Sequence, residues 1–169
     1  MKTYESERLR YISFHRDYAQ DLYELDANPG VMRYLGGVKV SSLEQTLSMI
    51  DDVIIQYEKY GMGRFLAIEK ESRKCIGWTG LKWIDVPFGD DMNYIDLGYR
   101  FKPEFWGKRY ATESATWWKQ FAEEHFPDKR LRASAHVDNI GSRKALQNAG
   151  FKEVKDKTIL GLPCVWLKP

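Results

Sequence analysis

The sequence predicts one α/β domain of the α+β kind, residues 1–169, with a mixed sheet and helices on both faces. Three observations predict it. An alternating strand over 94–101 leads into a helix over 110–125 and a further strand over 130–135, and such a crossover is right-handed and parallel. The strands on either side are joined by short turns, which only antiparallel pairs permit. A chain of 169 residues that is 43% hydrophobic buries one sizeable core.

The N-terminal third predicts one strand and three helical segments. Residues 9–14 read as a strand, and residues 17–27 have helical apolar spacing that stops at an Asn-Pro pair. A short helical piece follows at 31–35. A capping-box pattern at 41–44 opens a longer helix, for which Gly61 is a natural C-cap. Its spacing predicts one buried stripe: Leu43, Leu47, Ile50, Ile54 and Tyr57.

The rest of the chain predicts strands around two more helices. The long helix begins at Tyr110 and ends before Pro127, and a short helix over 139–149 is closed by Gly150. Residues 86–92 are expected as a loop. The strands expected here are residues 64–69, 74–84, 93–101, 130–135, 151–159 and 164–167.

The composition argues against several classes of protein. A net charge of +2 implies no large electrostatic field for nucleic acid or a membrane, and no run of about 18 apolar residues is present. The first ten residues are too polar for a signal peptide. We therefore expect a cytoplasmic protein in which Cys75 and Cys164 are free thiols. His15, His125 and His136 have no metal-ligand spacing, so no metal is expected.

The segment from Tyr94 to Glu113 predicts an anion site. Its strand breaks at Pro103, a basic turn with Lys108 and Arg109 follows, and a helix then begins. The first N–H groups of a helix have no intrahelical partner, and the helix dipole adds positive charge there. The expected ligand is a phosphate group.

Four segments carry a family resemblance through their order and spacing. They are ERLRY at 7–11 with NPGVMRYL at 28–35, IGWTGL at 76–81, IDLGY at 95–99 with WGKRYATE at 106–113, and VDNIGSRKAL at 137–146 with AGF at 149–151. Together they resemble the GNAT superfamily of acyl-CoA-dependent N-acetyltransferases, and most of all its branch of bacterial ribosomal-protein N-terminal acetyltransferases.

The resemblance implies acetyl-CoA as cosubstrate and assigns its binding to three groups of residues. The pyrophosphate cradle is Trp106, Gly107, Lys108, Arg109, Tyr110, Ala111 and Thr112; the main chain along pantetheine and the thioester is Leu97, Gly98 and Tyr99; the short helix adds Asn139, Ser142 and Lys144. For Lys144 and its neighbour Arg143, a solvated helix face is as good a reading as a phosphate contact.

Arg109 departs from the family pattern, which usually has a second glycine at this position. The cradle uses main-chain N–H groups, so a side chain is tolerated if φ stays negative, and a guanidinium beside phosphate helps. A site that needs positive φ would instead be weakened by Arg109. We expect tolerance.

The reaction that the resemblance implies needs a proton acceptor for the amine and a donor for the departing thiolate. Asp96 is either that base, a carboxylate that attracts a cationic amine, or an ion-paired strand residue, with function and structure evenly weighed. Ser142 is the candidate donor near the sulfur, because Leu146 stands where many relatives have a tyrosine. Asn139 also fits a helix N-cap. Glu113 is expected to act structurally, through the helix dipole.

The acceptor is the least determined part. Trp78, Trp83, Tyr34 and Tyr99 either line its slot or are core. Asp85, Asp90 and Asp91, in and beside the loop over 86–92, either attract a basic acceptor or are solvated charges, the commoner case.

We therefore expect an N-acetyltransferase that moves acetyl to a primary amine by direct transfer, as a monomer or a homodimer. A peptide N-terminus is the first choice of acceptor, by analogy with the branch. A CoA-binding sensor or partner-binding domain is the alternative, because Arg109 and Leu146 depart from the pattern. An unrelated mononucleotide-binding protein ranks last, because neither the P-loop nor the GxGxxG pattern is present.

Overall fold

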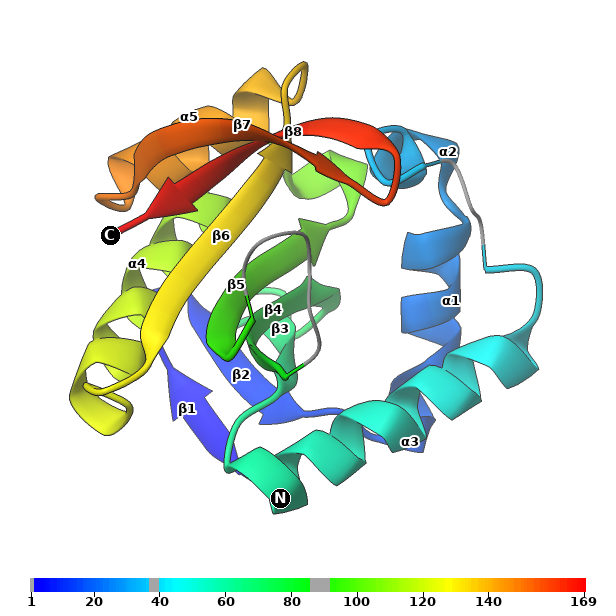
Figure 1. Ribbon diagram of the computed structural model, residues 1–169. Coiled ribbons are helices and arrows are strands. Elements are labelled where there is room, and N and C mark those ends of the chain that lie inside the picture. Colours follow the sequence, from blue (N-terminus) through cyan, green and yellow to red (C-terminus); the bar gives the residue numbers. More distant parts are fainter. Residues whose placement is uncertain (1, 37–39, 86–91) are drawn as a thin grey trace.

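The computed structural model describes residues 2–36, 40–85 and 92–169, which form an eight-stranded sheet flanked by helices (Figure 1). The strand order is β1-β2-β3-β4-β5-β6-β8-β7. The strands are β1 (Thr3–Glu5), β2 (Leu9–Ser13), β3 (Arg64–Glu69), β4 (Cys75–Ile84), β5 (Tyr94–Phe101), β6 (Arg130–His136), β7 (Lys152–Ile159) and β8 (Leu162–Lys168). β5 and β6 pair in parallel and the other neighbours pair antiparallel, which confirms the predicted mixed sheet.

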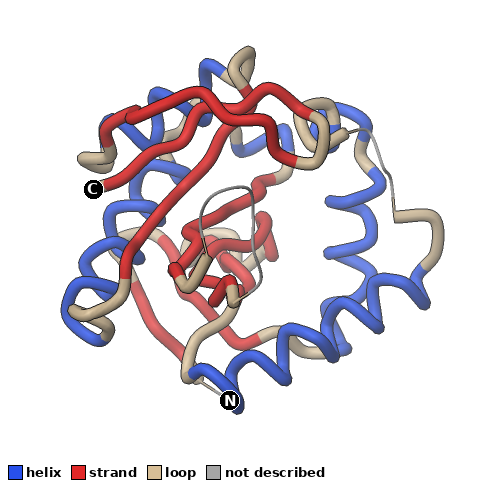
Figure 2. The backbone as a smooth tube through the Cα atoms, viewed as in Figure 1, coloured by secondary structure: helices blue, strands red, loops and turns tan. Residues whose placement is uncertain are grey.

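Helices cover both faces of the sheet, as Figure 2 shows. They are α1 (Ala19–Ala27), α2 (Pro29–Met32), α3 (Leu43–Tyr60), α4 (Tyr110–His125) and α5 (Ile140–Asn148), with single 3-10 turns at Arg16–Tyr18 and Pro103–Phe105. The alternation of β3 separates the two faces: Phe65 and Ala67 join the cluster around Trp118 of α4, whereas Leu66 joins the cluster around Ile50 and Val53 of α3.

The start of α3 differs from the prediction by one residue. Ser42 is the N-cap, and its Oγ accepts from the Gln45 N–H, while the Gln45 side chain accepts from the Ser41 N–H. The cap therefore lies one position later than the 41–44 pattern, and the Gln45 side chain reaches the N–H of the residue before the N-cap rather than that of the N-cap itself, as it would in a capping box. Leu43 is 41% exposed, because the first helical residue extends beyond the packed part of α3. Of the predicted stripe only Ile50 is buried; Leu47, Ile54 and Tyr57 are half-buried, and the other buried residues of α3 are Thr46 and Val53.

Two other segments differ from the prediction. The short helix is α2 at Pro29–Met32 rather than 31–35, because Asn28 caps it by accepting from the Gly30 N–H and Pro29 suits the first helical position. β1 was not predicted, since its composition is polar; it pairs with β2 at the edge of the sheet. The bounds of β3 and α4 are the predicted ones, and Gly61 ends α3 with a φ of 68°.

Candidate active site

β5 and β6 separate partway along their length. They pair over Tyr94–Leu97 and Arg130–Ala133, but β5 continues along β4 to Phe101 and β6 continues along β8 to His136. The last residues of each strand therefore have one main-chain edge without a strand partner. Since buried N–H and C=O groups require partners, this divergence suits an extended ligand that carries amide groups.

The N-terminus of α4 lies just beyond the end of β5. Residues 106–109 are exposed, Gly107 has a φ of 74°, and no side chain caps the helix at Arg109. The first intrahelical bond runs from the Glu113 N–H to the Arg109 carbonyl, at 3.0 Å. The N–H groups of the first turn are left for a ligand, and the helix dipole favours an anion.

Arg109 does not have the negative φ that we expected. Its φ is 66°, the left-handed conformation that a glycine adopts freely and an arginine adopts at a cost of about 1–2 kcal/mol. Two hydrogen bonds hold the residues before it: the Trp106 indole donates to the Phe101 carbonyl at 2.7 Å, and Arg8 donates to the Lys108 carbonyl at 3.0 Å. Arg109 itself is exposed.

Glu113 ties the N-terminal segment to this turn. Its carboxylate accepts from the Ser6 hydroxyl at 2.6 Å and from the Arg8 N–H and Nε at 2.8 Å each. Burial raises the pKa of Glu113, but these hydrogen bonds and the Arg8 charge outweigh burial and hold the pKa below its ordinary 4.5. The structural role expected for Glu113 is the one these contacts support. They also explain the ERLRY segment, whose role was not evident from the sequence.

A tyrosine hydroxyl reaches Ser142 from β5. The Tyr99 Oη lies 3.0 Å from the Ser142 Oγ and 3.2 Å from the Ser142 carbonyl oxygen. Asn139 caps α5 by accepting from the Ser142 N–H at 3.1 Å, as predicted. Leu146, at the usual tyrosine position, is fully buried in the core. Sequence reasoning considered Tyr99 only for main-chain contacts and an acceptor wall, because the bend that brings β5 to α5 is tertiary.

Asp96 lies on the other face of β5, in an ion pair with Arg64. The Arg64 guanidinium also donates to the carbonyls of Gly80 and Asp96. A Cβ added at Gly98 would lie 2.8 Å from the Arg64 Nη2, so the glycine makes room for this side chain. Burial lowers the pKa of Arg64, and the Asp96 carboxylate opposes that shift. Of the roles considered for Asp96, these contacts support that of an ion-paired strand residue.

Two more ion pairs continue along this face. Arg100 donates to Asp26 of α1 at 2.8 Å, and Lys102 donates to Asp21 at 2.7 Å. The Trp78 ring lies beneath the guanidinium groups of Arg64 and Arg100, at 5.3 and 5.1 Å from its centroid. Sequence reasoning missed these pairs, although charges at alternate positions of β5 were a signal that one face of the strand is polar.

The other residues expected in the cradle or near it differ in their contacts. Lys108 lies over the Phe105 ring at 4.9 Å, and Lys144 is exposed. Arg143 donates to both carboxylate oxygens of Glu153, at 2.8 and 2.9 Å, so its guanidinium is engaged within the fold.

The aromatic and acidic residues proposed for the acceptor side are dispersed. Tyr34 packs on His136 with ring centroids 5.4 Å apart. Trp83 packs near Tyr60, whose hydroxyl donates to Asp85 at 2.5 Å. Asp90 and Asp91 lie outside the described residues.

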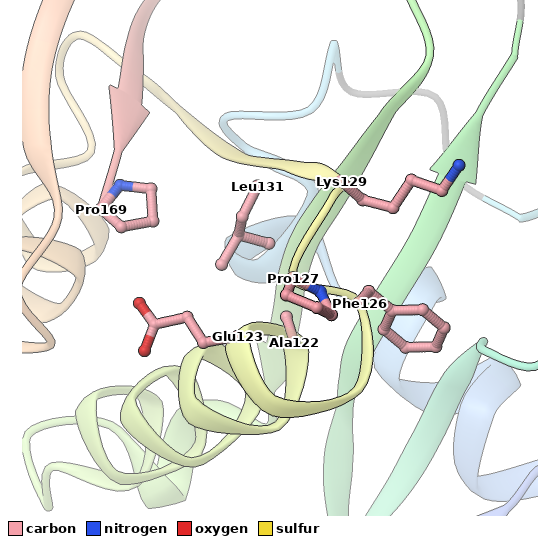
Figure 3. Close-up of a pocket in the computed structure, with 7 residues that line it drawn as sticks. All are labelled: Ala122, Glu123, Phe126, Pro127, Lys129, Leu131 and Pro169. Carbon is pink, nitrogen blue, oxygen red and sulfur yellow. The ribbon is translucent and has the colours of Figure 1, made fainter.

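Two pockets flank α4. One, of about 210 Å³, lies at its C-terminal end against Leu131 and Pro169 (Figure 3). Glu123 and Lys129 are the charged residues that line it, and it is remote from the divergence of β5 and β6. The other, of about 380 Å³, lies beside the N-terminal turns of α4 and is lined in part by Arg8 and Arg109.

The comparisons with known proteins show the family and the fold. The model of the acetyltransferase (GNAT) domain matches residues 8–152. The chain belongs to this family. It is 26% identical to the uncharacterized N-acetyltransferase p20 of Bacillus licheniformis over 90% of this chain and 84% of that protein. The GNAT fold predicted from the sequence is confirmed, and the protein is an acetyltransferase by family.

Solved structures share the fold at low sequence identity. A putative GNAT-family acetyltransferase from Bordetella pertussis is similar with a TM-score of 0.83 at 14% identity, covering 99% of this chain and 98% of that one. The ribosomal L7/L12 α-N-protein acetyltransferase RimL, solved in complex with coenzyme A, gives 0.77 at 14% identity, covering 98% and 97%. The suspected ribosomal-protein branch is thus among the structural neighbours.

The described residues bear on three other expectations. Cys75 and Cys164 are both free and buried, and burial raises the pKa of each thiol. No group of three or more potential metal ligands occurs among the residues that the structure describes. Within residues 2–36, 40–85 and 92–169, no helix has both the length and the apolar character that crossing a bilayer requires.

Proposed function

We propose that the protein transfers acetyl from acetyl-CoA to the primary amine of a protein N-terminus or of a small molecule, by direct attack of the amine on the thioester. One observation carries the proposal: the diverging ends of β5 and β6 lie next to the uncapped N-terminus of α4, in a chain of an acetyltransferase family. The helix end suits the pyrophosphate, and the strand edges suit the amide-bearing arm of the cosubstrate.

The donor side of the site is assigned to main chain more than to side chains. The N–H groups of residues 106–112 would hold the pyrophosphate, and the main chain of Leu97, Gly98 and Tyr99, where β5 leaves β6, would pair with the pantetheine arm. Asn139 and Lys144, at the start of α5, border the same region. Acetyl-CoA supplies the activated acetyl group; the protein binds and orients it.

The chemistry requires that the amine lose a proton and the sulfur gain one. Ser142 is the proposed hydroxyl donor to the sulfur. Asp96 is the proposed carboxylate on the acceptor face. Because Arg64 already neutralises its charge, we propose that water accepts the amine proton and that Asp96 acts by ordering this face of the site.

The test is release of free thiol from acetyl-CoA, followed with DTNB, against peptides, polyamines, aminoglycosides and amino acids. We expect amine-dependent release, strongest with a peptide N-terminus, because RimL, by its name an α-N-protein acetyltransferase, has a similar fold. Ser142→Ala and Asp96→Asn should reduce it. Folded protein that binds no acetyl-CoA in calorimetry would disprove the proposal.

A second candidate is a CoA-binding module without transferase activity. The observation that favours it is Leu146, buried in the core where many relatives have a tyrosine. Tight CoA binding with no thiol release for any amine in the panel would favour this candidate over the first.

A further inference from the structure

The hydroxyl of Tyr99 has the two oxygens of Ser142 as its hydrogen-bond partners. It lies 3.0 Å from the Oγ and 3.2 Å from the carbonyl oxygen. Tyr99 comes from the part of β5 that has left β6, and Ser142 comes from the first turn of the helix that follows β6. The two hydroxyls thus meet across the divergence that the proposed function assigns to the reactive end of acetyl-CoA.

A serine alone is a poor proton donor. Its hydroxyl is less acidic than a phenol, whose ordinary pKa is about 10, by several orders of magnitude. A phenol that donates to the serine oxygen makes the serine hydrogen more available to a third group, because hydrogen bonds in a chain polarise one another.

We propose that Tyr99 and Ser142 act as a two-hydroxyl relay that delivers a proton to the departing thiolate, with Tyr99 as the positioning residue behind Ser142. The inference rests on the proposed function. Many relatives have a tyrosine on α5 at the position of Leu146, which in this protein is part of the core. In the relay, Tyr99 of β5 supplies the tyrosine hydroxyl instead.

Every proton that moves through the relay is accounted for. The carbon–sulfur bond of the tetrahedral adduct breaks and its electron pair goes to sulfur. The Ser142 Oγ gives its proton to sulfur and takes one from the Tyr99 Oη. The amine loses one proton to water, and that proton returns to the phenolate, so both hydroxyls are restored after each turnover.

The surroundings of Tyr99 keep it in the form the relay needs. Burial raises the pKa of Tyr99 to about 12, with the Ser142 hydrogen bond opposing the shift. The phenol is therefore protonated at neutral pH and ready to donate. Its ring lies beside Phe101, with centroids 6.1 Å apart, and its hydroxyl faces the Ser142 hydroxyl.

The first test reads the pair without any acceptor amine. The thiol pKa of bound coenzyme A is measured from thiolate ultraviolet absorbance in wild type, Tyr99→Phe, Ser142→Ala and Tyr94→Phe. Tyr94→Phe is the matched control, since it removes a buried phenol hydroxyl about 16 Å away along the same strand. We expect the bound thiol to be most acidic in wild type and Tyr94→Phe. It should be less acidic in the other two variants. Equal values in all four proteins would overturn the relay.

The second test is kinetic. Tyr99→Phe should lower kcat about tenfold or more while KM for acetyl-CoA changes little, and the loss in Tyr99→Phe/Ser142→Ala should equal that of the worse single variant. Additive losses, or a change confined to KM and thermal stability, would mean that Tyr99 only packs against α5. Full activity of Tyr99→Phe overturns the relay but leaves the transferase intact. Absence of thiol release from wild type overturns the transferase itself.

Discussion

The two faces of the sheet are stabilised by different kinds of contact. The face beneath α4 is closed by aromatic rings: Trp118 lies within about 6 Å of Tyr4, Tyr11 and Phe65, centroid to centroid. The face toward α1 and α3 has the cation–carboxylate pairs of Arg64, Arg100 and Lys102. The stability of the first face depends on close packing, and the stability of the second depends on each buried cation keeping its carboxylate partner.

The difference has a functional reading under the proposed function. The aromatic face supports α4, whose N-terminus would meet the same cosubstrate at every turnover. The charged face would meet the acceptor amine, whose identity varies among acetyltransferases. Rigid packing suits the first task. Buried charges add little net stability but orient polar groups, which suits the second.

The largest effect is expected on the aromatic face. Trp118→Ala should lower the free energy of unfolding by about 3–5 kcal/mol, because it leaves a large cavity where a residue only 1% exposed was packed. Denaturant unfolding measures it. Trp106→Ala, which removes a 51% exposed ring, is the control and should cost much less. Equal losses would mean that the cluster is not what stabilises this face.

The charged face should respond to a single missing charge. Asp26→Asn leaves the Arg100 guanidinium without its carboxylate and should cost about 3 kcal/mol in the same measurement. Asp26→Leu combined with Arg100→Met should recover most of that loss, because the charge and its partner leave together. Asp17→Asn, at an 82% exposed side chain, is the control. A double variant as unstable as the single one would show that volume governs this face too.

Glu113 ties Ser6 and Arg8 to the first turns of α4 and predicts a pH dependence. Its pKa is lowered in the folded protein, so its contribution is present above the ordinary 4.5 and is lost as pH falls through the folded value. Glu113→Gln should cost about 2 kcal/mol at neutral pH and flatten the acid side of the stability profile, as pH falls below the ordinary pKa of 4.5. If the variant loses stability at acid pH as steeply as wild type does, other carboxylates are responsible for that loss.

The smallest effect is expected at the turn itself. Arg109→Gly should raise stability by up to about 1 kcal/mol, because glycine adopts a φ of 66° without strain. Gly107→Ala is the matched opposite, since it adds a Cβ at a φ of 74° and should lower stability by about the same amount. Because the N–H groups stay in place, CoA affinity of Arg109→Gly should be close to wild type. A large loss of affinity would assign a phosphate contact to the guanidinium.

Local chemistry accounts for the elements that the sequence predicted well. β3 and α4 have the predicted bounds, since an alternating run and a helical run are each closed by turn residues. The Asn139 cap and the Gly61 C-cap were predictable because each depends on residues within one turn. The polar strand β1 was not predictable, because it is a strand through its pairing with β2 rather than through its own composition.

The sequence by itself determined the family, the mixed sheet and the position of the turn before α4, because hydrophobic periodicity, caps and motif spacing are local properties. Only the tertiary structure decided that Arg109 is left-handed, that Asp96 is paired with Arg64, and that Tyr99 meets Ser142. Each of these depends on residues at least 30 positions apart or on packing from both sides of a turn. Such contacts are set by how strands diverge and helices dock, which no short stretch of sequence encodes.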